Sequence, residues 1–314
     1  MRCLALMNQK GGVGKTTTTV NLAAGLALSG RRVLLVDLDP QAHATLHLGE
    51  SPSTLQDSVY DVLLDPDLAL DGPLITSRER LDLLPAETDL AGIEQDLGGE
   101  PDRQHRLRRV LDGARDRYDA VLIDCPPSLG LLTLSGLAAA DQVLIPMQAH
   151  FLALEGVSKL LETVGLVRGS LNPSLRVAGV VLCMHEQQTT LAQEVVEELR
   201  TFFDSARGTD KPWSDARVFE PAIRRNIKLA ESPSFGKTIF EYAPEAAGAA
   251  DYEQLTRVIG ERVFPTESDR SPPEVVVRPH AAAEPFQVAD PDPRPAAQPE
   301  ARPEAGARDA GSRA

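Results

Sequence analysis

The chain carries near its amino terminus the glycine-rich stretch Lys10-Gly11-Gly12-Val13-Gly14-Lys15-Thr16-Thr17. Glycines allow the backbone to wrap closely around a phosphate group and to point N–H groups at its oxygens. The amino end of the helix expected to follow adds its positive dipole. In such a loop the lysine after the last glycine reaches the β- and γ-phosphates, and the next hydroxyl ligates Mg²⁺. The stretch therefore predicts a phosphate-binding loop in which Lys15 and Thr16 take these two roles.

On both sides of this loop, short apolar runs alternate with amphipathic stretches. We expect strands at Cys3–Asn8, Val33–Asp37, Leu81–Leu84, Ala120–Asp124, Gln142–Pro146 and Val177–Leu182. We expect helices at Lys15–Ser29, Arg103–Arg117, Leu154–Val167, Thr190–Phe203 and Ala249–Val263. Near-continuous apolar strands separated by helices indicate a parallel sheet that is covered on both faces. The predicted fold class is therefore α/β, a doubly wound, mostly parallel sheet with helices on both faces.

The composition limits the class of protein. The chain has 314 residues and a net charge of −14, which argues against nucleic-acid binding unless cations are clustered locally. No window approaches the roughly 18 apolar residues of a membrane-spanning helix, and the first apolar run is too short for a secretory signal. The cysteines are too few and too scattered for a disulfide framework. We expect a cytoplasmic protein.

The glycine-rich stretch departs from the common G-x-x-x-x-G-K-[ST] pattern, because Gln9 stands at the first glycine position and Lys10 follows it. This deviant Walker A form resembles that of the ParA/Soj chromosome- and plasmid-partitioning ATPases. The resemblance spans about Met1–Val263 and is carried by Asn8–Thr18 (NQKGGVGKTTT), Val36–Gln41 (VDLDPQ), Ile123–Gly130 (IDCPPSLG), Leu171–Pro173 (LNP) and Leu229–Lys237 (LAESPSFGK). It implies a deviant Walker P-loop ATPase domain over residues 1–264.

Residues 265–314 form a separate, proline- and alanine-rich tail with few large apolar side chains. Such a segment cannot offset its ordering entropy by burial, so we expect it to be disordered. The sequence leaves no room for a helix-turn-helix ahead of the phosphate loop, so we expect the short, Soj-type form of the family.

Three carboxylates follow predicted strands. Asp37 and Asp39 end one strand, and whether their side chains share a direction depends on whether the strand has already ended at Asp37. Asp124 ends another strand, at the Walker B position, and carboxylate oxygens are ligands that Mg²⁺ prefers. The resemblance implies that Asp39 orients the water that attacks the γ-phosphate. It also implies that Asp37 supports the Mg²⁺ shell and that Asp124 holds Mg²⁺ directly or through water.

The resemblance implies a complete nucleotide site for ATP and Mg²⁺. Lys10 would reach across a homodimer interface to the partner's nucleotide, so that Lys10, Lys15 and Asp39 are the expected catalytic residues. The adenine would lie near Met184-His185-Glu186 and Phe219–Asn226, where His185-Glu186 and Arg224 replace the Tyr-Asp and the proline usual in the family. ATP rather than GTP rests on the resemblance, since no Asn-Lys-x-Asp motif is present. The expected nucleotide-binding residues are Lys10, Gly11, Gly12, Val13, Gly14, Lys15, Thr16, Thr17 and Met184.

A basic stretch lies at Ala216–Phe240, where two carboxylates, Glu220 and Glu231, accompany five cations: Arg217, Arg224, Arg225, Lys228 and Lys237. The resemblance implies that an ATP-bound sandwich dimer binds double-stranded DNA non-specifically through such residues. A ParB-like, centromere-binding partner would stimulate slow hydrolysis and release the DNA, and the protein would associate with the nucleoid. A solvated face with salt bridges is the alternative interpretation of the stretch, and Arg224 could instead line the base pocket.

Other functions stay open on the sequence alone. A MinD-like ATPase that cycles on membranes usually carries a basic amphipathic helix at its carboxyl end, whereas this tail is acidic. An iron–sulfur reductase of the nitrogenase-iron-protein type needs well-placed cysteines, and Cys125 and Cys183 do not fit that pattern. A ParA relative that positions a protein cargo would share the same ATPase residues. His43 and His47 stand four residues apart, but no third metal ligand is evident.

Overall fold

The structure of the chain is a computed structural model that describes residues 1–265 with the exception of 66, 69, 151–152 and 187–189. The predicted tail, 265–314, lies outside the described residues except for its first residue. The chain divides into the units Met1–Ser271 and Pro272–Ala314, and the second unit lies wholly outside the described part. The predicted boundary between residues 264 and 265 therefore stays a prediction.

Within the described residues, one eight-stranded sheet runs in the order β3-β4-β2-β5-β1-β6-β7-β8. Its strands are β1 (Arg2–Leu6), β2 (Val33–Asp37), β3 (Ile75–Arg78), β4 (Leu81–Leu84), β5 (Ala120–Asp124), β6 (Gln142–Met147), β7 (Arg176–Leu182) and β8 (Arg217–Phe219). All neighbours pair in parallel except β3 and β4. The six predicted strands are present, and the two that were missed lie at the sheet edges.

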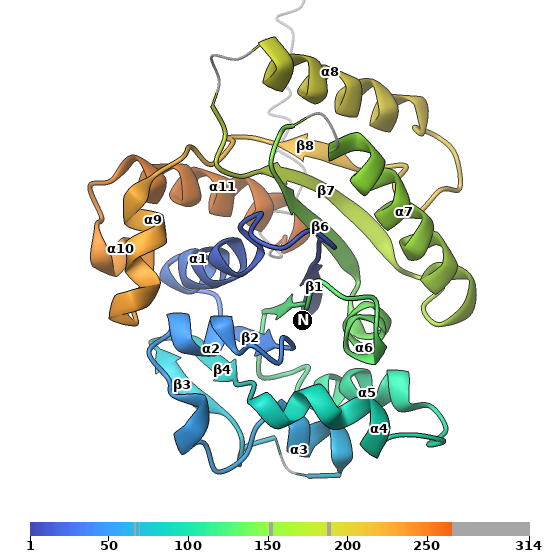
Figure 1. Cartoon of the computed structure of the whole chain (residues 1–314), viewed down its shortest axis with the longest axis vertical. Coiled ribbons are helices and arrows are strands. Elements are labelled where there is room, and N and C mark those ends of the chain that lie inside the picture. Colours follow the sequence, from blue (N-terminus) through green and yellow to red (C-terminus); the bar gives the residue numbers. More distant parts are fainter. Residues whose placement is uncertain (66, 69, 151–152, 187–189, 266–314) are drawn as a thin grey trace, which may run out of the picture. The chain divides into compact units, whose positions relative to one another are not determined.

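Helices cover both faces of this sheet (Figure 1), which confirms the predicted fold class. The helices are α1 (Lys15–Leu28), α2 (His43–His47), α3 (Val59–Leu64), α4 (Ile93–Asp96), α5 (Arg106–Gly113), α6 (Leu131–Ala139), α7 (Ala153–Ser170), α8 (Thr190–Ser205), α9 (Ile227–Glu231), α10 (Ile239–Tyr242) and α11 (Ala247–Val263). Short 3-10 turns add η1 (Pro52–Thr54), η2 (Thr88–Gly92), η3 (Arg103–His105) and η4 (Ser232–Phe235). None of the helices among the described residues is long and apolar enough to cross a bilayer.

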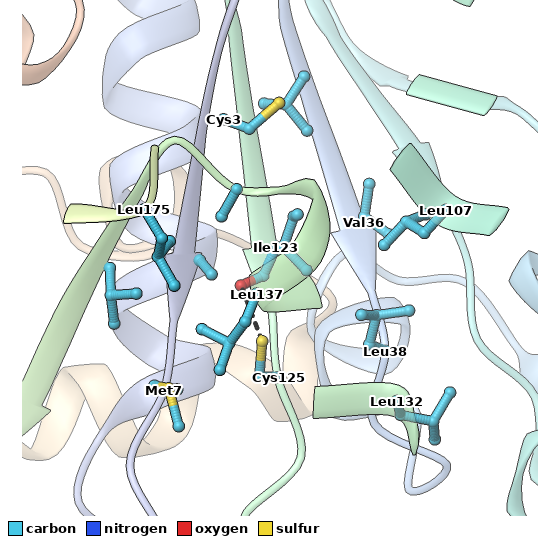
Figure 2. Close-up of a cluster of buried hydrophobic side chains, with 14 of the residues drawn as sticks. Cys3, Met7, Val36, Leu38, Leu107, Ile123, Cys125, Leu132, Leu137 and Leu175 are labelled. Atoms are coloured by element: carbon cyan, nitrogen blue, oxygen red, sulfur yellow. Dashed lines mark hydrogen bonds between the residues drawn. The ribbon is translucent and has the colours of Figure 1, made fainter. Parts of the chain in front are cut away.

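Two hydrophobic clusters hold the layers together, one on each face of the sheet. Side chains of the central strands alternate between them: Leu122 packs in the cluster under α1 and α11, while Ile123 packs in the cluster with α5 and α6. Figure 2 shows the second cluster, where Ile123 and Cys125 lie beside Leu137 of α6. A Cβ atom on Gly136 would lie 2.9 Å from Cys125 Sγ, so a small residue is needed where α6 approaches β5.

The topology brings the predicted site residues to one edge of the sheet. Parallel strands end at the same edge, and ligands of open α/β sheets bind there. Strand β1 leads into the glycine-rich loop, while Asp37 and Asp124 end the adjacent strands β2 and β5 and face each other in register. Three motifs that are far apart in the sequence therefore converge beyond the carboxyl ends of β1, β2 and β5.

Candidate nucleotide-binding site

The glycine-rich loop adopts backbone conformations that favour glycine. Gly12 and Gly14 have φ angles of 72° and 95°, in the left-handed region that other residues rarely adopt. A Cβ atom on Gly11 or Gly12 would meet no atom within 4 Å, whereas a Cβ atom on Gly14 would lie 3.2 Å from Cys183 Cβ. The loop therefore presents bare backbone to open space on one side and packs closely against the segment after β7 on the other.

A cavity of about 920 Å³ lies over this loop. Lys15 borders it at the start of α1 and is only 7% exposed. The predicted site residues that line the cavity are Gly11, Gly12, Gly14, Lys15, Thr16, Thr17, Asp39 and Met184. Two predicted nucleotide-binding residues, Lys10 and Val13, line a separate small cavity of about 40 Å³ beside β6 and α7.

The oxygen ligands expected for Mg²⁺ come together at the base of the loop. Thr16 Oγ1 donates a hydrogen bond to Asp124 Oδ2 at 2.7 Å, and Thr19 Oγ1 donates one to Asp124 Oδ1 at 2.7 Å. Burial raises the pKa of Asp124, while the two hydroxyls and the Lys15 ammonium oppose that rise. A hydroxyl beside a carboxylate is an oxygen donor set that suits Mg²⁺, so these residues fit the ion. Thr19 was not predicted, although its position three residues after Thr16 places both on one helix face.

Asp37 lies behind this site rather than in it. Strand β2 ends at Asp37, and the buried carboxylate accepts hydrogen bonds from Thr45 N, from Thr45 Oγ1 and from Asp39 N at 2.9, 2.9 and 3.1 Å. Burial and the neighbouring Asp124 charge raise its pKa. In this arrangement Asp37 holds the turn that carries Asp39 and anchors α2, and it does not line the cavity.

Asp39 lies in the turn after β2 and borders the cavity. Its Oδ1 accepts a hydrogen bond from Gln41 N at 3.0 Å, and the residue is 8% exposed. His43 and His47 line the same cavity, but no group of three or more metal-ligating side chains occurs among the residues that the structure describes. The cavity therefore combines the phosphate loop, a buried lysine and one carboxylate held by its own turn.

A second cavity of about 390 Å³ adjoins the loop where the resemblance places the base. Met184, at φ 49°, lines both cavities. His185 N donates a hydrogen bond to Ile223 O at 2.9 Å, which brings the segment after β7 beside the segment after β8. The two predicted base segments thus lie side by side, with Ile223, Arg224, Arg225, Asn226, Leu229 and Tyr252 in the lining.

Arg224, which stands where the family usually has proline, is tied to α11. Its backbone N–H and its guanidinium both donate to the Asp251 carboxylate, with Arg224 Nη2 at 2.7 Å from Asp251 Oδ1. Asp251 is 6% exposed, and proline could not supply the backbone donor. The ion pair with Asp251 explains how arginine is accommodated at this position. Because the guanidinium is already paired, Arg224 acts as a structural residue in the wall of the second cavity.

The predicted basic stretch is only partly available for an external anion. Arg225 pairs with Glu186 at 3.0 Å and Lys228 pairs with Glu231 at 2.9 Å. Arg217 lies apart on β8, where burial and the nearby Arg262 and Arg207 lower its pKa. Among the described residues, Arg217 and Lys237 have no ion-pair partner. Of the five predicted cations, Arg224 is therefore paired with a buried carboxylate, Arg225 and Lys228 are in exposed ion pairs, and the other two are in no ion pair within the described residues.

Arg78 connects three segments around this site, and nothing in the sequence singled it out. Its guanidinium donates to Leu48 O after α2, to Gly236 O after η4 and to Glu241 Oε1 of α10, at 3.1, 2.8 and 2.8 Å. The partners lie between 30 and 163 residues away in the chain, so no local pattern could reveal them. Arg78 thereby joins the segment that follows Asp39 to the segment that contains Lys237.

Comparisons with known proteins show what the chain is similar to. A family model described as an AAA domain matches residues 1–177. The chain is 42% identical to the chromosome partitioning protein ParA of Caulobacter vibrioides over 261 residues, which cover 82% of this chain and 94% of that protein. It is 47% identical to the chromosome-partitioning ATPase Soj of Thermus thermophilus over 264 residues, which cover 84% and 97%.

Among solved structures, the chain is similar to one described as a cobyrinic acid a,c-diamide synthase from Mycobacterium smegmatis with bound ADP and magnesium. The TM-score is 0.70 and the identity is 36%, over 85% of this chain and 98% of that one. The matched relatives are thus similar to this chain over nearly their whole length.

Proposed function

The chain belongs to the ParA/Soj family of chromosome-partitioning ATPases, and from this membership we propose that it hydrolyses ATP with Mg²⁺ and uses the ATP-bound state to bind DNA. The proposal has three parts: a nucleotide site that hydrolyses ATP slowly, a homodimer that closes around two ATP molecules, and a DNA-binding surface that depends on the dimer. A ParB-like protein would stimulate hydrolysis and so release the DNA, in the cytoplasm at the nucleoid.

In the proposed nucleotide site the chain's own groups bind and orient the triphosphate. Backbone N–H groups of the loop surround the phosphates, and the Lys15 ammonium neutralises charge on the β- and γ-phosphates. When bound, Mg²⁺ would add positive charge at the phosphate oxygens, with Thr16 and Asp124 as its protein contacts. The related structure with ADP and magnesium supports this choice of ligands.

One observation carries the hydrolysis proposal. Asp39 borders the same cavity as the phosphate loop and is held there by its own turn, where its carboxylate can orient a water toward the γ-phosphate. Asp37 fixes the start of that turn through the Asp39 N–H. We therefore propose that Asp39 orients the water and that Asp37 positions Asp39.

The test compares Asp39→Ala with the wild type and with Glu50→Ala as a surface control. Asp39→Ala should bind ATP normally, lose nearly all turnover, and sediment as a dimer with ATP. Turnover assays and sedimentation measure these outcomes on the same samples. Near-normal turnover would remove Asp39 from the reaction and overturn the assignment.

For the DNA surface, we propose that Arg217, Arg225, Lys228 and Lys237 contact phosphates, while Arg224 chiefly supports the protein through Asp251. Exposed ion pairs such as Arg225–Glu186 contribute little to stability, so a DNA phosphate can replace the carboxylate at small cost. The buried Asp251 carboxylate, in contrast, would be left unpaired if Arg224 moved to DNA.

A further inference from the structure

Lys10 is engaged within its own subunit. Its Nζ lies 2.7 Å from Nε2 of His150, in the segment that follows β6. An ammonium group has only donors, so Nε2 must accept the hydrogen bond. The His150 ring in this contact is therefore neutral and carries its proton on Nδ1.

Neighbouring contacts hold the start of the loop on β6 and on the segment that follows it. Asn8 Nδ2 donates to Pro146 O at 2.8 Å, Gln148 Nε2 donates to Gly12 O at 3.3 Å, and Asn8 Oδ1 accepts from Lys10 N at 3.0 Å. Lys10 and His150 line one small cavity, away from the large one over the phosphate loop. Lys10 thus points toward β6 of its own chain.

We propose that His150 is a positioning residue that retains Lys10 in its own subunit and must release it before Lys10 can reach the nucleotide of a second copy. The inference rests on the proposed homodimer and on the role of Lys10 across its interface. Closing a symmetric dimer then breaks two Lys10–His150 contacts, so this hydrogen bond opposes dimerisation and sets part of its ATP requirement.

The experiment measures the ATP-dependent dimer dissociation constant by sedimentation in an Asp39→Ala background, so that hydrolysis does not deplete the dimer. His150→Ala removes the contact. Each subunit loses one hydrogen bond, and each loss should lower the dimer dissociation constant about threefold. His150→Ala should therefore lower that constant about tenfold at pH 8. His150→Gln retains an acceptor near the position of Nε2 and should match the background protein at pH 8.

The conservative variant separates retention of Lys10 from a general packing effect. His150→Gln should keep the dimer constant of the background protein, whereas His150→Ala should tighten the dimer. His105→Gln, which removes another histidine at the start of α5, should also keep the constant of the background protein. An unchanged or weaker dimer for His150→Ala, or an equally tightened dimer for His150→Gln, would overturn the proposal.

A separate variant tests the premise. Lys10→Ala should bind ATP as a monomer and fail to form the active dimer. If Lys10→Ala dimerises and hydrolyses ATP normally, the role of Lys10 across the interface is wrong. If Lys10→Ala fails to dimerise while His150→Ala behaves as the background protein does, only the retention by His150 is wrong.

Discussion

Asp37 and Asp39 stand two residues apart, and the structure separates what each can do. The sequence left open whether they share a strand, because strand alternation and an early strand end predict different directions. Strand β2 ends at Asp37, so its carboxylate turns inward to Thr45 while Asp39 borders the cavity. Spacing alone could not decide this, since Thr45 comes close only when α2 folds back over the sheet end.

His47 gives a prediction on stability and pH at the scale of one residue. The side chain is 1% exposed, and burial lowers its pKa to about 4, against an opposing hydrogen bond with the Lys237 backbone. The unfolded chain binds this proton near pH 6.5, so the folded state loses stability as the pH falls from about 6.5 to about 4. The loss should approach about 3 kcal/mol from this group alone.

The check is urea unfolding between pH 7 and pH 4 without nucleotide. His47→Gln should flatten the pH dependence, because its side chain does not titrate. The exposed neighbour His43 is the matched control, and His43→Gln should keep the wild-type slope. A wild-type slope in His47→Gln would show that other groups, and not His47, govern the acid response.

At the scale of elements, the strands were predictable where they are continuous and buried. Strands β2, β4 and β5 have the predicted bounds, because each is a short apolar run between turns or charged segments. The edge strands β3 and β8 were missed since they are short and partly polar, and edge pairing leaves one side unconstrained. Helix α6 was missed because it is apolar all round and shows no periodicity.

The predicted helix Arg103–Arg117 was wrong in its extent. It consists of the 3-10 turn η3 and the shorter helix α5, which ends at Gly113. Glycine is a poor residue for a helix interior and favours an end. The base segments and the Arg78 contacts depend on pairs of distant residues, which a single sequence does not disclose.

The contacts of Arg78 between distant elements lead to a testable prediction. Arg78→Ala removes three contacts between β3, α2 and the η4–α10 segment, so it should destabilise the protein by about 2 kcal/mol. It should also raise hydrogen exchange in residues 43–49 and 233–242 together. Arg80→Ala is the control, because the Arg80 side chain is half exposed and its ion pair with Glu79 is long, at 3.9 Å. Exchange that rises in neither segment would contradict the joining role of Arg78.

For the whole molecule, the proposed DNA binding has to be reconciled with a strongly negative net charge. The net charge of −14 opposes DNA binding by a single subunit. Several of the predicted cations are paired with carboxylates of their own chain. A dimer doubles the number of cations that one DNA segment can meet, and so raises affinity without any new kind of contact. Nucleotide state can thus control DNA affinity through assembly.

The proposed division at residue 264 predicts that the body folds without the tail. A chain ending at Pro265 should keep the melting temperature and the basal ATP turnover of the full chain, because both hydrophobic clusters are already extensive within the described residues before that point. Thermal unfolding and turnover of the two chains provide the comparison. A lower melting temperature in the shortened chain would place part of the folding unit beyond residue 264.

The most direct test of the account measures DNA affinity of the wild type with ATP and with ADP across a salt series. With ATP the log–log salt slope should be about −6, for a dimer that neutralises about three phosphates per subunit, and with ADP about −3 with much weaker binding. Arg225→Ala combined with Lys228→Ala should make the ATP slope shallower on every DNA sequence. Equal affinity with both nucleotides, or a wild-type slope in the double variant, would contradict the account.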